Sequence, residues 1–485
     1  MGAITMWGLK KAGAGIWLVA LVVSMGLSVV PEAQAQACAN TGPGSLSLVC
    51  GDGATTGGSA ASTAIGSLSN STATFSVAVG AVAKATNTEA TAVGAGTEAS
   101  GSSSTAVGGR YDLDGSTLVT PDEVTFASET GASAFGAAAQ ATEQFATALG
   151  TAATARGIGS TATGFTSIAA GVGSSALGSA SLALGDYSSA LGGLAYAGAH
   201  YATAAGTYSA ATGDEAAAFG AQAWATAYRA TAIGTASRAH GETSFAGGYD
   251  SYASGDSSVA LGNRSAATAD GAIAIGAGSQ ASGVNAIAIG TNAVATGSVA
   301  VGNGAMAGSG GAAFGDGTAA TGTDSTAVGP NAVATHANAV AIGAHSVTGA
   351  DNTVSVGSAG NERRITNVAP GVAPTDAATV GQVNGAVAGV NDAIADMSGQ
   401  ISGIHESISD LTGGIAAVAA QAPVIMPSAP GKTTLSLNTA YYRSTLGIGV
   451  GVAHRLDLPS PTVVYGSWSN GGGENVVRAG VSTEF

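Results

Sequence analysis

The stretch Ala272-Ile273-Ala274-Ile275-Gly276 sets the pattern of the chain, and it returns fourteen residues later as Ala286-Ile287-Ala288-Ile289-Gly290. The same phrase closes on glycine throughout, at Gly66, Gly80, Gly94, Gly108, Gly136, Gly150, Gly164, Gly178, Gly192, Gly206, Gly220, Gly234, Gly248, Gly262, Gly302, Gly315, Gly329, Gly343 and Gly357. The step is fourteen residues nearly everywhere and shortens only at Gly302 and Gly315. Alanine stands five residues after most of these glycines, as at Ala281, so each repeat carries two short strand-like pieces.

A repeat of this length cannot bury an apolar face alone, so it must stack on identical neighbours. The sequence therefore predicts a mainly β solenoid, roughly 100 Å long at ~4.8 Å per coil. Alternate residues of a strand point to opposite faces, with Ile273 and Ile275 on one and Ala272 and Ala274 on the other. Both faces are apolar, and alanine requires a covering surface that comes very close. We infer that one face packs inside the coil and that the other packs on other chains.

Composition excludes several classes of protein. The 485 residues include 77 glycines, and only 9% are charged and 5% aromatic, unlike an ordinary globular core. A formal charge of −15 argues against nucleic acid as a partner, because nucleic acid requires a basic stripe. An enzyme needs polar groups that converge, and we expect no catalytic, cofactor or metal site because the histidines do not recur with the repeat. They are His200, His240, His336, His345, His405 and His454.

The first 37 residues have the features of a secretory signal peptide. Lys10 and Lys11 precede the apolar run 16–30, and small residues suited to cleavage follow it. The alternative is a membrane helix that the mature protein retains. Cleavage after residue 37 would make an exported protein.

The only cysteines, Cys38 and Cys50, lie in the segment 38–65, the expected N-terminal tip. In an oxidising compartment, a pair that flanks Gly-Pro-Gly most simply closes a small loop. A lipidated Cys38 is the alternative, but Ala35 stands where a lipidation signal usually has leucine. The sequence does not establish whether the pair closes within one chain.

The repeat array occupies residues 66–357 and is interrupted once, at 109–130, where the phrase expected near position 122 is missing. This segment is the most charged part of the array and contains proline, so we expect a loop or a degenerate coil extruded from the stack.

Alternating carboxylates in the insertion raise the possibility of a calcium loop, because Asp112, Asp114 and Glu123 could converge on a hard cation. Thr117 stands where such a loop has its turn glycine, and Pro121 intrudes. These departures favour a solvated acidic loop.

The array ends in a long, specific motif, NTVSVGSAGNERRITNVAPG over residues 352–371, followed by Thr375-Asp376-Ala377 and Gln382. It resembles the neck of YadA-like trimeric autotransporter adhesins, although Ala378-Thr379 stands where that family usually has Val-Asn. The resemblance covers nearly the whole mature chain, and it implies a head built as a left-handed parallel β-roll of fourteen-residue repeats.

We assign residues 358–379 to this neck and single out Glu362, Arg363, Arg364 and Asn367. The three charges are clustered in a charge-poor chain, which predicts ion pairs where a wide domain narrows to a thin one. An exposed patch is the alternative. Thr375 or Asp376 is the predicted cap of a helix that starts near Ala377.

A heptad seam runs through residues 380–420, the expected stalk. Its apolar residues alternate steps of three and four, at Val380, Val383, Val387, Val390, Ile394, Met397, Ile401, Ile404, Ile408, Leu411, Ile415 and Val418. Isoleucine at both seam positions favours trimers over dimers, although the second position is mixed. A buried helix of a globular domain could show the same stripe. The glycine, serine and acidic residues between leave no second apolar face, which favours self-association.

The pattern changes to period two in residues 421–485, where we expect strands at 433–442, 445–454, 462–469 and 475–485. The second alternates Leu446, Ile448, Val450 and Val452 with glycine and alanine, as a lipid-facing strand with a bare inner side would. Four strands alone leave open edges that lipid does not tolerate, so three chains would close a twelve-stranded barrel around three helices. The segment resembles the family's membrane anchor, in which a terminal aromatic residue, here Phe485, marks the barrel for outer-membrane assembly.

The sequence is thus identified as a member of a family of surface adhesins. The resemblance implies a homotrimer in a Gram-negative outer membrane, placed there by the barrel-assembly machinery, whose barrel supports export of its own head. It also implies attachment to matrix proteins such as collagen, to other surfaces or to cells. The alternative is a surface-structural or ice-binding solenoid without a specific receptor, which would lack the last fifty residues.

Overall fold

The computed structural model describes residues 38–40, 46–111 and 123–485. The predicted signal peptide lies outside these residues. The chain forms two compact units, one that ends at Arg363 and one that spans Arg364–Phe485.

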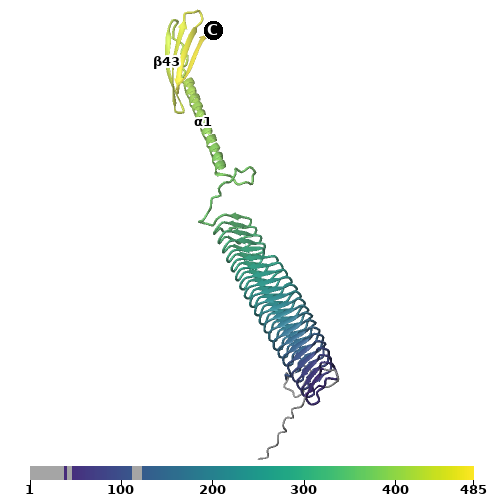
Figure 1. The fold of residues 1–485 in the computed structure, drawn as a ribbon. Coiled ribbons are helices and arrows are strands. Elements are labelled where there is room, and N and C mark those ends of the chain that lie inside the picture. The colour runs from purple at the N-terminus through teal and green to yellow at the C-terminus, as the bar shows by residue number, and fades with distance from the viewer. Residues whose placement is uncertain (1–37, 41–45, 112–122) are drawn as a thin grey trace, which may run out of the picture. The chain divides into compact units, whose positions relative to one another are not determined.

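The first unit is a stack of coils, each with a three-residue strand and a two-residue strand (Figure 1). The longer strands form one parallel sheet, the odd sheet: β2 (Leu48–Cys50), β3 (Thr63–Ile65), β5 (Val77–Val79), β7 (Thr91–Val93), β9 (Thr105–Val107), β11 (Ser133–Phe135), β13 (Thr147–Leu149), β15 (Thr161–Thr163), β17 (Ser175–Leu177), β19 (Ser189–Leu191), β21 (Thr203–Ala205), β23 (Ala217–Phe219), β25 (Thr231–Ile233), β27 (Phe245–Gly247), β29 (Val259–Leu261), β31 (Ile273–Ile275), β33 (Ile287–Ile289), β35 (Val299–Val301), β37 (Ala312–Phe314), β39 (Thr326–Val328) and β41 (Val340–Ile342), with the two-residue β42 (Val354–Ser355) at its end.

The shorter strands form the second parallel sheet, the even sheet: β4 (Asn70–Ser71), β6 (Lys84–Ala85), β8 (Glu98–Ala99), β10 (Phe126–Ala127), β12 (Gln140–Ala141), β14 (Thr154–Ala155), β16 (Ile168–Ala169), β18 (Leu182–Ala183), β20 (Tyr196–Ala197), β22 (Ala210–Ala211), β24 (Trp224–Ala225), β26 (Arg238–Ala239), β28 (Tyr252–Ala253), β30 (Ala266–Ala267), β32 (Gln280–Ala281), β34 (Val294–Ala295), β36 (Met306–Ala307), β38 (Ala319–Ala320) and β40 (Val333–Ala334). The predicted parallel β-solenoid with two short strands per repeat is confirmed.

The register follows the repeat, so that Ile273 pairs with Ile287 and Ala274 pairs with Ala288. The alanine face points inward, because Ala274 and Ala281 are fully buried while the isoleucines on either side of Ala274 are not. The core of the described coils is built almost entirely from alanine, and its largest fully buried side chains are threonines such as Thr97. The coil is therefore too thin to enclose the larger side chains of its own strands.

The glycine that closes each phrase is required by the approach of the next coil. Gly276 has φ +127°, and a Cβ there would lie 2.5 Å from the carbonyl oxygen of Gly290. Three residues later, the buried hydroxyl of Ser279 donates to the Gly276 carbonyl at 2.9 Å. Backbone and side chain thus both fix the turn.

The N-terminal end of the odd sheet is closed by an antiparallel pair, β1 (Ala39–Asn40) with β2. A disulfide joins Cys38 to Cys50 within the chain, with a Cα–Cα distance of 4.5 Å. Strand β1 thus covers the edge of β2, the strand at which the stack begins.

The insertion leaves the stack without breaking it. Strand β9 pairs directly with β11, so that Ala106 faces Ala134, and β8 pairs with β10. The stack is therefore continuous across the insertion, whose residues 112–122 lie outside the described part of the chain. Asp112 and Asp114 of the suggested calcium loop lie outside the described residues.

The second unit contains helix α1 (Val380–Ala419) and an antiparallel sheet with strand order β43-β44-β45-β46. The predicted helix start is wrong by three residues. Thr379 caps α1 instead of Thr375 or Asp376. Its hydroxyl accepts a hydrogen bond from the Gln382 backbone amide at 3.2 Å, and the Gln382 side-chain oxygen accepts one from the Thr379 backbone amide. The described helices include none long and apolar enough to cross a bilayer.

The four strands are β43 (Thr433–Tyr442), β44 (Thr445–Leu456), β45 (Thr462–Gly471) and β46 (Glu474–Thr483). In β44, Leu446, Ile448 and Val452 are exposed on one face, and the glycines between them are buried on the other. A Cβ at Gly447 would meet the carbonyl oxygen of Ala416 in α1. The bare face of the sheet thus receives the end of the helix.

Candidate functional site

An apolar stripe runs along the outward side of the odd sheet. The last residue of many of its strands is large and about half exposed: Phe135, Leu149, Leu177, Leu191, Phe219, Ile233, Leu261, Ile289, Phe314, Val328 and Ile342. No described strand from β3 to β41 of this sheet contains a charged residue. Monomeric soluble proteins rarely expose large apolar patches, which makes this stripe a candidate surface for association.

The even sheet has a different outward side, because it carries charged residues. Lys84 and Glu98 pair at 3.3 Å across neighbouring coils, and Arg238 pairs with Asp250 at 3.2 Å. Charged and polar groups lie in solvent far more often than in an interface core. The two sheets thus divide the surface of the coil stack into an apolar side and a solvated side.

Ion pairs also connect the turns between coils. The Nε of Arg229 lies 2.8 Å from Oε2 of Glu215, and its guanidinium stands 4.7 Å above the ring of Tyr228. The hydrogen bond from Arg229 lowers the pKa of Glu215, and the same bond raises the pKa of Arg229. Burial, with a smaller effect of Arg238, lowers the pKa of His240.

The neck uses Arg363 to close the last coil of the stack. Its guanidinium donates to the Ser346 hydroxyl at 2.9 Å, to the Val356 carbonyl at 2.7 Å and to the Ala344 carbonyl. These groups have no further coil to bond to. Sequence reasoning missed this role. The repeat does not indicate which residue after the array bonds to its last coil.

The other neck residues contact backbone or lie exposed. The Glu362 carboxylate accepts from the Gly360 amide at 2.8 Å, and this bond lowers the pKa of Glu362. Arg364 and Asn367 are exposed. Among the ion pairs of the described residues, none includes Glu362, Arg363 or Arg364. Within one chain, Glu362 and Arg363 therefore act through hydrogen bonds to the backbone and to the Ser346 hydroxyl.

The segment before α1 is held by two side chains that sequence reasoning did not single out for this role. Asp376 accepts from the amides of Val372 and Ala373, both at 2.9 Å, and the bonds lower the pKa of Asp376. Gln382 accepts from the Gly371 amide and donates to its carbonyl, both at 2.9 Å. These contacts direct the chain from the preceding loop into the start of α1.

The predicted stalk seam lies on one helix, and none of its residues is buried within the chain. All twelve seam residues are between 39% and 76% exposed, among them Ile394, Met397, Ile401, Ile404, Ile408 and Leu411. Only Gly413, Ala416 and Ala417 of α1 are buried, against the sheet. A single chain gives this seam no partner.

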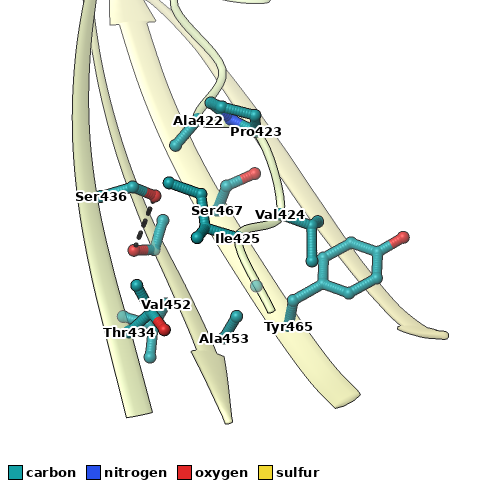
Figure 2. A pocket seen from close by; sticks show the side chains of 12 residues that line it. Ala422, Pro423, Val424, Ile425, Thr434, Ser436, Val452, Ala453, Tyr465 and Ser467 are labelled. Carbon is teal, nitrogen blue, oxygen red and sulfur yellow. Dashed lines mark hydrogen bonds between the residues drawn. The ribbon is translucent and has the colours of Figure 1, made fainter. Parts of the chain in front are cut away.

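The inner side of the sheet holds the chain that follows α1. Figure 2 shows Ala422 and Pro423 beside Ser436 and Ser467, with the Ser436 hydroxyl bonded to the Gly451 carbonyl at 3.3 Å. On the other side, Val450 is half-buried, and Phe485 at the chain end is fully exposed. The sheet thus has a small-residue inner side and an apolar outer side.

The described residues contain no group of three or more histidine, cysteine, aspartate or glutamate side chains that could hold a metal. Several histidines instead bond to threonine hydroxyls, as His240 does to Thr226 at 2.7 Å and His336 to Thr348 at 3.0 Å. Glu123 of the suggested calcium loop is buried.

The model of the YadA head domain repeat matches residues 60–83, 85–110, 127–153, 144–167, 155–181, 183–209, 211–237, 239–265, 267–293, 281–305, 320–346 and 338–358, which together make up more than half of the chain. Among solved structures, the collagen-binding domain of the Yersinia adhesin YadA is 21% identical, with 58% of this chain and 97% of that chain covered and a TM-score of 0.16. No curated protein matches the sequence.

Proposed function

The chain belongs to the family of YadA-like trimeric autotransporter adhesins, and on that premise we propose that it works as a homotrimer anchored in an outer membrane. Its coil stack is an adhesin head. The finer proposal is that three chains share the apolar stripe, the stalk seam and the sheet, and that the head attaches to matrix proteins, other surfaces or other cells.

The exposed seam of α1 carries the proposal. Twelve apolar side chains at alternating steps of three and four, each at least 39% exposed, cannot stay in water on a forty-residue helix that contains seven glycines. Glycine disfavours an isolated helix by about 1 kcal/mol per residue. Burying the seam between parallel helices removes this apolar area from water at ~25 cal/mol per Å², and the isoleucines favour three strands over two.

The sheet supports the same stoichiometry. Strands β43 and β46 are the edges of the described sheet, and each has one side without a partner strand. Exposed edges invite pairing with further chains, and a closed ring of strands removes them. Three sheets would make a twelve-stranded barrel whose glycine-lined interior admits three helix ends. The outward Leu446, Ile448, Val450 and Val452 would then face lipid.

Export follows from the same arrangement. The segment 421–431 runs from α1 to β43 along the inner side of the sheet, as Ala422 and Pro423 do in Figure 2. We assign to this barrel the passage of the head to the cell surface, and to Phe485 a signal for the barrel-assembly machinery. Attachment to collagen-like matrix proteins is the partner class proposed from the named relative.

Expression of the full chain in a Gram-negative host tests the proposal. We expect protease added to intact cells to remove the head, a detergent extract to run as a heat-resistant trimer, and cells to adhere to plates coated with matrix proteins. Ile401→Asn places a polar side chain in the seam and should abolish the trimer, while Ser402→Asn, one residue away and outside the seam, should not. A monodisperse monomer from the unmodified chain would refute the proposal.

A further inference from the structure

A row of aromatic side chains stands on the solvated side of the head. Tyr196, Trp224 and Tyr252 are each the first residue of an even-sheet strand. The register places Ala210 between the first two and Arg238 between the last two. A ring therefore recurs at every second coil, about 10 Å apart. We name Tyr196, Trp224 and Tyr252 the ring row.

Two of the three rings, Tyr196 and Tyr252, pack against neighbouring groups, and Trp224 is the most exposed. Tyr196 lies across the next outward position of its own coil, because a Cβ at Gly198 would come within 2.8 Å of its Cε1. Tyr252 packs edge-on against His240, with 5.7 Å between ring centroids. Trp224 is 47% exposed. The two packed rings lose little conformational entropy when a ligand covers them.

Carboxylates lie on the turns that follow neighbouring even-sheet strands: Asp214 follows β22, Glu242 follows β26, Asp256 follows β28 and Asp270 follows β30. Asp214 accepts from the His200 amide at 3.2 Å, Asp256 from the Glu242 amide at 2.9 Å and Asp270 from the Asp256 amide at 3.0 Å. Each bond uses only Oδ1 of its aspartate and fixes that side chain against the preceding coil. We name Asp214, Glu242, Asp256 and Asp270 the acid row.

The basic side chains on these coils do not neutralise the acid row. Arg229 pairs with Glu215 at 2.8 Å. Arg238 and Arg264 both pair with Asp250, at 3.2 and 3.9 Å. None of the ion pairs found in the described part of the chain includes a member of the acid row. The surface therefore combines aromatic rings with uncompensated negative charge, in a chain whose formal charge is −15.

We propose that the ring row and the acid row together bind a cationic, extended polypeptide segment. This inference rests on the proposed adhesin function and gives the chemistry of one partner. Guanidinium or ammonium groups are attracted to the faces of tryptophan and tyrosine, and they form charge-assisted hydrogen bonds with carboxylates. Negative potential along the row speeds the approach of such a segment and repels acidic polymers. A neutral glycan would use the rings but gain nothing from the acid row.

The test uses the full-length trimer in detergent and a fluorescent peptide of alternating arginine and glycine. A version with glutamate in place of arginine and a neutral cello-oligosaccharide are the comparison ligands. The triple variant Asp214→Asn, Glu242→Gln, Asp256→Asn removes three charges but keeps an acceptor oxygen at each position. Its control is Asp351→Asn, because Asp351 accepts from the Ala337 amide at 2.9 Å on the same turn of a distant coil.

We expect fluorescence anisotropy to show binding of the arginine peptide only, weakened by added salt. The triple variant should bind about tenfold more weakly, the effect of losing three exposed charge pairs. Trp224→Ala should bind about threefold more weakly. Asp351→Asn should bind as the unmodified protein does, and so should Gln280→Ala, which changes the same strand position in β32.

Unchanged affinity in the triple variant, or equal binding of the glutamate peptide or the oligosaccharide, would overturn the proposal. Trimer formation and adhesion to matrix-coated plates are measured on the same preparations. If both persist while the peptide fails to bind, only the cationic partner is refuted. If the trimer or its surface display is absent, the proposed function itself fails.

Discussion

Replacement of Gly276 by alanine should lower the stability of the coil stack by several kcal/mol, because the added methyl group would clash with the next coil. Gly276 has φ +127°, and an alanine Cβ would lie 2.5 Å from the oxygen and 2.6 Å from the carbon of the Gly290 carbonyl. Both are backbone atoms of the next coil, so neither can swing away. A residue held in such a conformation costs about 1–3 kcal/mol, and overpacking adds about 1–3 kcal/mol. We expect Gly276→Ala to destabilise the coils by about 2–6 kcal/mol.

Gly304 provides a matched control with the same substitution. Its φ is +64°, and nothing lies within 4 Å of an added Cβ. One coil earlier, the same turn position holds Asn292 with φ 55°, so a side chain is already accepted there. Gly304→Ala should therefore cost only about 1–2 kcal/mol.

Hydrogen exchange of the full-length trimer, measured by mass spectrometry, reports the local stability of each coil in the two variants. Because repeats contact only their neighbours, the loss at Gly276 should be concentrated in the coils of β29 to β33 rather than spread over the head. Exchange in those coils should rise strongly in Gly276→Ala and only slightly around Gly304→Ala. Equal exchange in the two variants would show that close stacking of the glycine backbones does not limit the coil.

Three further predictions concern the neck and the stalk. Arg363→Ala should increase hydrogen exchange in β41 and β42 by leaving the carbonyls of Ala344 and Val356 without their donor, and unchanged exchange would contradict the capping role. Hydrogen bonds from the backbone amides lower the pKa of Asp376. The carboxylate of Asp376 therefore stabilises the segment before α1 fully at any pH above the ordinary carboxyl pKa, and this stabilisation is lost as the pH falls through the lowered pKa. Protection of the bonded amides, corrected for intrinsic exchange, should fall over that acid range, and Asp376→Asn should remove the pH dependence. Ile401→Asn should convert the heat-resistant trimer to monomer on an unheated denaturing gel, since a polar side chain would then lie in the seam.

The repeat made most of the head predictable from sequence. Every coil has the same neighbours, so the period alone indicated the parallel strands and their register. The alternation in β44 likewise indicated its two faces, and the glycine face does receive α1. Strand ends differ by one or two residues, as at Leu456 and Gly471, because turn geometry rather than pattern ends a strand.

The tertiary structure decided the features that occur only once. Both faces of Ala272-Ile273-Ala274-Ile275 are apolar, and the thinness of the coil is what places alanine inside. Strands β9 and β11 pair across the insertion, the last coil ends on Arg363, and Thr379 rather than Thr375 or Asp376 caps α1. A repeated contact leaves a period in the sequence, whereas a single contact between distant residues leaves none, so only the folded chain shows where it forms.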